Sequence, residues 1–120
     1  MNSVKETFMT NRIAAPFRRA GIESPRRLVE EYAFMLEDIP ELIRIRIYEG
    51  LEEHWIETDQ SHYLQAPGMD LPAISDTQRY RDATAALEDV LKDFTEGYYA
   101  ARNAGHTPDV AWLLPNRYFR

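Results

Sequence analysis

Two histidines and two carboxylates lie close together in the segment HWIETDQSH, residues 54–62. Imidazole and carboxylate groups bind zinc, iron, nickel and manganese, which makes these four side chains candidate metal ligands. They are His54, Glu57, Asp59 and His62. Their spacing matches neither the HExxH motif of zinc enzymes nor the Glu-x-x-His pairs of di-iron bundles. We therefore interpret the cluster as the water-facing end of a helix, and we predict no metal site and no cofactor.

The sequence contains few other side chains that could act as catalytic groups. The chain has no cysteine, which excludes disulfides, thiolate nucleophiles, zinc-thiolate sites and iron-sulfur clusters. Three of the four serines precede expected helices, where a serine acts as a cap, and no glycine-rich elbow presents a hydroxyl group. The five glycines are isolated and form no phosphate-binding motif. We therefore expect a protein that is not an enzyme.

Four arginines surround a short turn in the segment FRRAGIESPRRL, residues 17–28. They are Arg18, Arg19, Arg26 and Arg27. A helix, a turn and a second helix in this order are typical of a helix-turn-helix, but Arg27 and Glu30 fall where the second helix normally buries apolar side chains. Glu31 would also repel phosphate groups. We interpret the segment as a basic edge that pairs with an acidic surface of the protein itself or of a partner. A DNA-binding regulator that uses residues 12–31 is the alternative.

Charge is sorted along the chain. Residues 1–27 have a net charge of +4, residues 28–96 of −12 and residues 97–120 of +2, which together give the −6 of the whole chain. Most of the acid is expected on the water-facing sides of helices. One acidic row could instead imitate phosphate groups, so an inhibitor of a nucleic-acid-binding protein is a second alternative. The row consists of Glu49, Glu53, Glu57 and Asp59.

Length and composition are those of one soluble domain. The chain has 120 residues, of which 44% are hydrophobic and 28% charged, enough apolar material for one core. The first residues contain no apolar stretch of the kind found in signal peptides, and no run of about 18 apolar residues occurs. We therefore expect a cytoplasmic protein without a membrane span.

Capping patterns and apolar stripes predict three main helices. They cover residues 25–37, 39–57 and 76–104, begin at Ser24, Asp38 and Ser75, and follow a short N-terminal helix capped by Ser3 with Glu6. The alternation from Ile43 to Ile47 is typical of a strand, but it lies inside a longer helical pattern. In the last helix Gly97 interrupts the apolar stripe, and Gly105 is a natural stop.

The sequence thus predicts a single all-α domain, a small helical bundle of three main helices with short N- and C-terminal helices and one long packed loop. Its segments are a basic N-terminal helical segment (1–23), a helical pair (24–57), the loop (58–74), the long helix (75–105) and an aromatic C-terminal tail (106–120). The tail is too apolar to remain free, and its docking on the same domain or on a partner is left open.

We expect a non-catalytic interaction or regulatory protein that binds another macromolecule, above all a protein. Self-association is left open, as is nucleic-acid binding through the basic N-terminal segment. Phe34 is a candidate contact because helical periodicity places it among charged side chains. The full set of candidate partner-binding residues is Arg18, Arg19, Arg26, Arg27, Phe34, Trp112, Tyr118 and Phe119.

Overall fold

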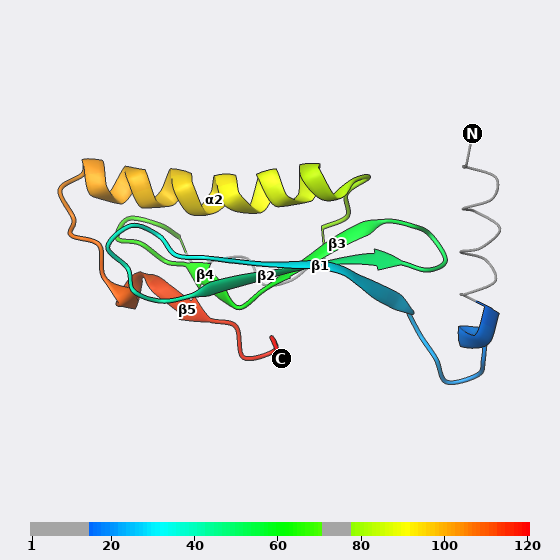
Figure 1. Cartoon of the computed structure of the whole chain (residues 1–120). Helices are drawn as coiled ribbons and strands as arrows, with labels where there is room; N and C mark the ends of the chain where they lie inside the picture. Colours follow the sequence, from blue (N-terminus) through cyan, green and yellow to red (C-terminus); the bar gives the residue numbers. More distant parts are fainter. Residues whose placement is uncertain (1–14, 71–77) are drawn as a thin grey trace.

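One long helix packs against antiparallel strands, as the computed structural model shows (Figure 1). The structure describes residues 15–70 and 78–120. These residues form five strands and only one helix longer than a single turn. The all-α helical bundle expected from the sequence is therefore wrong.

Three strands form one sheet and two short strands form another. β1 spans Arg26–Phe34, β2 Ile43–Gly50, β3 Ile56–Gln60, β4 His62–Leu64 and β5 Leu113–Pro115; helix α2 spans Ala83–Asn103, and single 3-10 turns lie at Ala15–Phe17 and Val110–Trp112. The first sheet has the order β1-β2-β3, and β4 pairs with β5; all pairs are antiparallel. Helix α2 lies over β2, β3 and β4 (Figure 1).

Strand β2 is the centre of the sheet, and its side chains alternate between two faces. Ile43, Ile45 and Ile47 are at most 1% exposed, while Arg44 and Arg46 point to the face opposite α2. The helix expected over residues 39–57 rested on apolar residues four positions apart. Four is also a multiple of two, so the same stripe lines one face of a strand. Ile45 separates the two patterns, because on a helix it would point about 200° away from Ile43.

Strand β1 replaces the helix expected over residues 25–37. Ser24 and Asp38, the expected helix caps, have φ angles of 50° and 64° and lie in the turns before and after the strand. Serine and aspartate favour caps and turns for the same reason, since their side chains hydrogen-bond to nearby backbone groups. The capping pattern therefore marks the boundaries of an element here, but that element is a strand and not a helix.

The long helix expected over residues 76–104 is confirmed as α2, together with its apolar stripe, but it begins later, at Ala83. The Asp82 carboxylate accepts a hydrogen bond from the Ala85 N–H at 2.8 Å and caps the helix. Ser75, the expected cap, and the Ser3 cap of the N-terminal helix lie outside the described residues. Gly105, with a φ angle of 95°, follows the end of α2 as expected. The buried stripe consists of Ala86, Val90, Phe94, Tyr98 and Ala101.

The C-terminal tail docks on its own domain. β5 pairs with β4, and the Asn116 N–H donates to the Ser61 carbonyl at 2.8 Å. Trp112 and Leu113 join the core. The described part of the expected loop over residues 58–74 contains the end of β3, all of β4 and a packed turn.

Candidate functional site

The outer edge of β1 is unpaired among the described residues. β2 pairs with one side of this strand, and no strand among the described residues pairs with the other side. β1 has nine residues and is therefore about 30 Å long. Only Val29 and Phe34 are partly buried; the other seven side chains are exposed. An edge strand of this kind presents a row of N–H and C=O groups on which another strand can pair.

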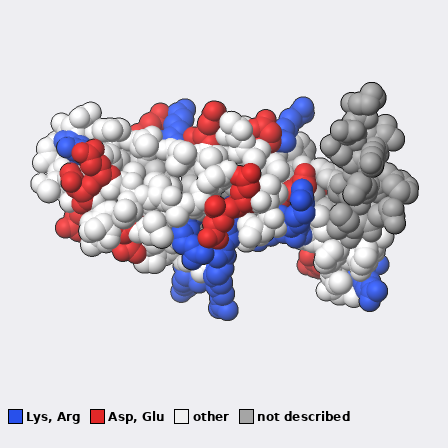
Figure 2. Space-filling model, viewed as in Figure 1, with Lys and Arg blue, Asp and Glu red and all other residues white. Residues whose placement is uncertain are grey.

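An apolar shelf lies beside this edge, and we define it as Tyr32, Leu87 and Leu91. On α2, Gly97 contacts the β4 side, and at 100° per residue Leu87 and Leu91 fall on the opposite flank, which faces β1. Both leucines are partly buried against the core, and Tyr32 is 42% exposed. Figure 2 shows a broad area without charged side chains between the helix and the edge of the sheet.

The charges of β1 are ordered, basic first and acidic second. Arg27 pairs with Glu49 across the sheet at 2.8 Å, and the Arg26 guanidinium lies 3.9 Å above the centre of the Tyr48 ring. Glu30 has no ion pair among the described residues. The strand therefore carries a basic half and an acidic half within six residues.

Glu31 joins two arginines of β2 on the face opposite α2. Its carboxylate accepts from Arg44 at 2.9 Å and from Arg46 at 2.5 Å. The hydrogen bonds from Arg46 and then Arg44 lower the pKa of the Glu31 carboxyl. The end of the chain closes over this group: the Phe119 ring centre lies 4.2 Å from the Arg46 guanidinium carbon, and Arg46 also donates to the Arg120 carbonyl.

Basic side chains gather on the surface near this end of the chain. Figure 2 shows them at the lower centre, where Figure 1 places the C-terminus. Phe119 is held there by the two β2 arginines, since the Arg44 guanidinium lies 5.4 Å from the same ring. The aromatic tail and the arginines therefore pair within one chain.

The expected partner-binding residues do not form one surface. Arg18 and Arg19 are exposed next to the first 3-10 turn. Phe34 packs edge-to-face on Phe94 with ring centres 5.5 Å apart, and Trp112 is 5% exposed, so neither has the exposure that helical periodicity indicated. Arg26 and Arg27 begin β1, while Phe119 lies over β2 and Tyr118 is 70% exposed in the tail.

The sequence interpretation missed Leu28 and Tyr32, which are exposed on the free edge. In the helix expected over this segment, both side chains would face the core. The signal that could have found the sheet was the alternation of isoleucine and arginine in β2. The order of strands, which makes β1 an edge, has no signal in a single sequence.

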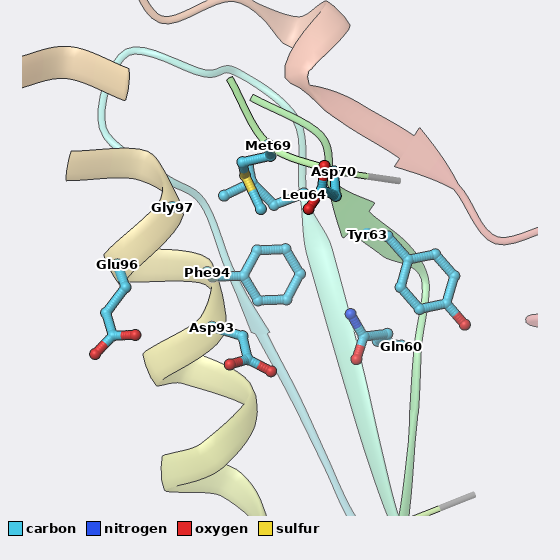
Figure 3. Close-up of a pocket in the computed structure, with 9 residues that line it drawn as sticks. All are labelled: Gln60, Tyr63, Leu64, Met69, Asp70, Asp93, Phe94, Glu96 and Gly97. Atoms are coloured by element: carbon cyan, nitrogen blue, oxygen red, sulfur yellow. The ribbon is translucent and has the colours of Figure 1, made fainter. Parts of the chain in front are cut away.

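A cavity of about 510 Å³ lies on the other flank of α2 (Figure 3). Phe94 and Gln60 point toward one another across it, whereas the Glu96 carboxylate points away. Its lining is apolar in the middle and acidic at the rim. The lining residues are Gln60, Tyr63, Leu64, Met69, Asp70, Asp93, Phe94, Glu96 and Gly97.

The pKa of one carboxyl group at the cavity is raised. Partial burial raises the pKa of Asp93, and the neighbouring carboxylates of Asp89 and Glu96 raise it further. Burial also raises the pKa of the Tyr63 hydroxyl.

The histidine and carboxylate cluster of the sequence is spread over the sheet. His54 lies in the turn between β2 and β3 with a φ angle of 59°, while His62 lies in β4, where its Nε2 is 3.3 Å from Glu41. Asp59 accepts from the Asn116 side chain at 3.3 Å. Residues 15–70 and 78–120 contain no group of three or more side chains placed to hold a metal ion.

Comparisons with protein-family models, with curated proteins and with solved structures each found no match. No helix in the described part of the chain combines the length and the apolar character needed to span a membrane. Function must therefore be inferred from the free edge of β1, its shelf and its charges.

Proposed function

We propose that this chain is a non-catalytic, cytoplasmic interaction protein that binds another polypeptide chain by strand addition at the outer edge of β1. The observation that carries the proposal is a nine-residue edge strand whose outer side has no partner among the described residues and whose side chains are mostly exposed. The backbone of an added strand would hydrogen-bond to β1, and its alternate side chains would reach the apolar shelf.

Edge strands usually carry features that discourage such pairing, and β1 has few of them. It contains no proline and no lysine, and it is longer than the typical strand. The protective features present are a β-bulge between Leu28 and Glu30 and the four charged side chains of the strand. The strand is thus suited to pair with a segment that fits this bulge.

The charges of β1 define the chemistry of the partner. The partner is an extended segment with acidic side chains opposite Arg26 and Arg27, and with basic side chains opposite Glu30 and Glu31. This order sets both the direction and the register of the added strand.

Both alternative functions were based on helices, and the segments concerned form strands and a turn instead. Residues 26–31, the expected recognition helix, belong to β1. Glu49, Glu53 and Glu57 lie on β2, in a turn and on β3, and not along one helix. The geometry therefore favours neither DNA recognition by a helix nor an acidic helical row.

Photo-crosslinking tests the proposal. A photoreactive phenylalanine analogue replaces Leu28, which is 52% exposed on β1, and in a matched variant it replaces Glu88, which is exposed on α2. Irradiation of the purified protein, and of cells that express it, is expected to give a covalent adduct with a second polypeptide from position 28 only. Mass measurement identifies that polypeptide, which is then tested as a purified component. Equal adducts from both positions, or none from position 28, would contradict strand addition.

A further inference from the structure

We propose that the strand added to β1 is β1 of a second copy of this chain, antiparallel and related by a two-fold axis. This inference rests on the proposed strand addition and names its partner. The segment RRLVEE, residues 26–31, is the reason. When a second RRLVEE segment runs antiparallel to the first, its two glutamates lie beside the two arginines of the first segment. The chain itself therefore contains the partner segment that β1 requires. A parallel pair would instead place arginine beside arginine and glutamate beside glutamate.

The register of β1 against β2 shows that the basic half and the acidic half of β1 lie at equal distances from one point of the strand. Arg26 and Arg27 lie level with Gly50 and Glu49, and Leu28 lies level with Tyr48. After the bulge, Glu30 lies level with Ile47 and Glu31 with Arg46. Tyr48 is therefore the midpoint: Arg27 and Glu30 are one step from it on either side, and Arg26 and Glu31 are two steps from it.

A two-fold axis that runs perpendicular to the sheet at the level of Tyr48 relates the basic half of one copy to the acidic half of the other. It sets Arg27 opposite Glu30 of the second copy, and Arg26 opposite Glu31 of the second copy. Residues at equal distances from the axis lie on the same face of the joined sheet, because side chains alternate along a strand. Without the bulge, Glu30 would lie two steps from the midpoint and on the other face. The bulge is thus the feature that makes this strand self-complementary.

The apolar surfaces of the two copies lie on the same face of the joined sheet in this arrangement. The Pro25 carbonyl accepts from the Leu51 N–H, so Pro25 is level with Leu51, three steps from Tyr48. Tyr32 is level with Ile45, three steps in the other direction, and so lies opposite Pro25 of the second copy. The axis keeps both α2 helices on one face of a six-stranded sheet. Their flanks with Leu87 and Leu91 then face each other across the junction.

Two charge-reversed variants test the pairing. In a dimer of Arg27→Glu, positions 27 and 30 of the two copies face each other as two glutamates. In a dimer of Glu30→Arg they face each other as two arginines, so each variant repels a second copy of itself. Mixed together, they restore both pairs, because each pair then joins a glutamate of one copy to an arginine of the other. Sedimentation velocity from about 1 to about 100 μM is expected to give the wild type twice the 14.0 kDa of one chain. Each variant alone should need at least tenfold more protein to dimerise, and the equimolar mixture should match the wild type.

The control variants reverse charges of the same signs away from the edge. Arg81→Glu and Glu88→Arg change exposed residues that have no ion pair among the described residues, and they should leave the dimer unchanged. Circular dichroism and urea unfolding establish that every variant is folded. A wild type that is monomeric at about 100 μM, or a mixture that stays monomeric, overturns the second copy as partner. If Leu28 nevertheless crosslinks one foreign protein, the proposed strand addition stands without self-pairing; if it crosslinks nothing, both fail.

Discussion

Gly97 lies where α2 packs against Leu64 of β4 and against Met69, and its missing side chain leaves room for them. A Cβ atom at this position would lie 2.8 Å from Leu64 Cδ2 and 2.8 Å from Met69 Sδ, closer than such atoms pack. The helix continues through Gly97 without a break, so the glycine makes room for the ends of these two side chains and does not mark a kink. The same contact closes one end of the cavity beside α2.

Replacing this glycine tests whether packing outweighs helix propensity. In an open helix Gly97→Ala would stabilise the protein by roughly 1 kcal/mol. Here overpacking costs about 1–3 kcal/mol, so we expect net destabilisation in urea unfolding. Ala100→Gly, on the exposed side of the same helix, is the matched control and should cost roughly 1 kcal/mol. Adding Met69→Ala should relieve part of the Gly97→Ala defect. A more stable Gly97→Ala protein would show that the strands move away at no cost.

At the scale of elements, Glu31 ties β1 to β2 and to the C-terminal tail. Its two ion pairs hold Arg44 and Arg46, whose guanidinium groups lie over Phe119. One carboxylate on β1 thus helps to position an aromatic ring that is 88 residues away in sequence. Loss of its charge should weaken the attachment of the tail.

The pH dependence of stability follows from this carboxylate. Its pKa is lowered from the usual 4.5 because Arg46 and Arg44 stabilise the charged form in the fold. The stabilisation is therefore complete above pH 4.5 and is lost as the pH falls through the lower value of the folded state. Glu31→Gln should unfold at a lower urea concentration than the wild type at about pH 7, and the difference should shrink toward about pH 3. Glu88→Gln should show no such trend. A constant difference between Glu31→Gln and the wild type at all pH values would contradict this origin.

Helix α2 was predictable because its buried stripe runs from Ala86 to Ala101, which is too long for a strand and consistent with no other period. Over β2 the apolar residues four apart fit a helix and a strand equally well, and the helical interpretation ignored Ile45. Capping signals reinforced the error, since Ser24 and Asp38 serve turns as well as helix starts.

The candidate site was less predictable than the elements. Arg26 and Arg27 were recognised from their charge, but the free edge depends on which strands become neighbours. Likewise Trp112 and Tyr118 lie six residues apart in one aromatic tail, yet one is 5% and the other 70% exposed. Burial of this kind follows from tertiary contacts that periodicity in a single short segment does not encode.

At the scale of the whole molecule, the charges to which the proposed function assigns a role occupy a small region of an acidic chain. Most of the −12 over residues 28–96 is spread among exposed side chains of both sheet and helix, and arginines interrupt it. The ordered charges of β1 differ because they lie on an edge with which no described strand pairs, although Arg27 and Glu31 also contact charged side chains of β2. Long-range repulsion between two copies, each with a net charge of −6, opposes association, and the local pairs at the edge must exceed it.

Salt separates these two electrostatic effects in the dimer. Raising NaCl from about 0.1 to about 1 M shortens the screening length from about 10 Å to about 3 Å, which weakens local pairs and net repulsion alike. The dimer holds four Arg–Glu pairs across its junction, each contributing about 0.2–1 kcal/mol because they are exposed. If these pairs dominate, the dissociation constant measured by sedimentation should rise about tenfold over this range. Arg27→Gln combined with Glu30→Gln removes two of the four pairs and should reduce the rise, whereas the swapped double variant Arg27→Glu with Glu30→Arg should keep it. A dissociation constant that falls with salt would mean that net repulsion dominates and that backbone hydrogen bonds and apolar contact, not the ion pairs, hold the two copies together.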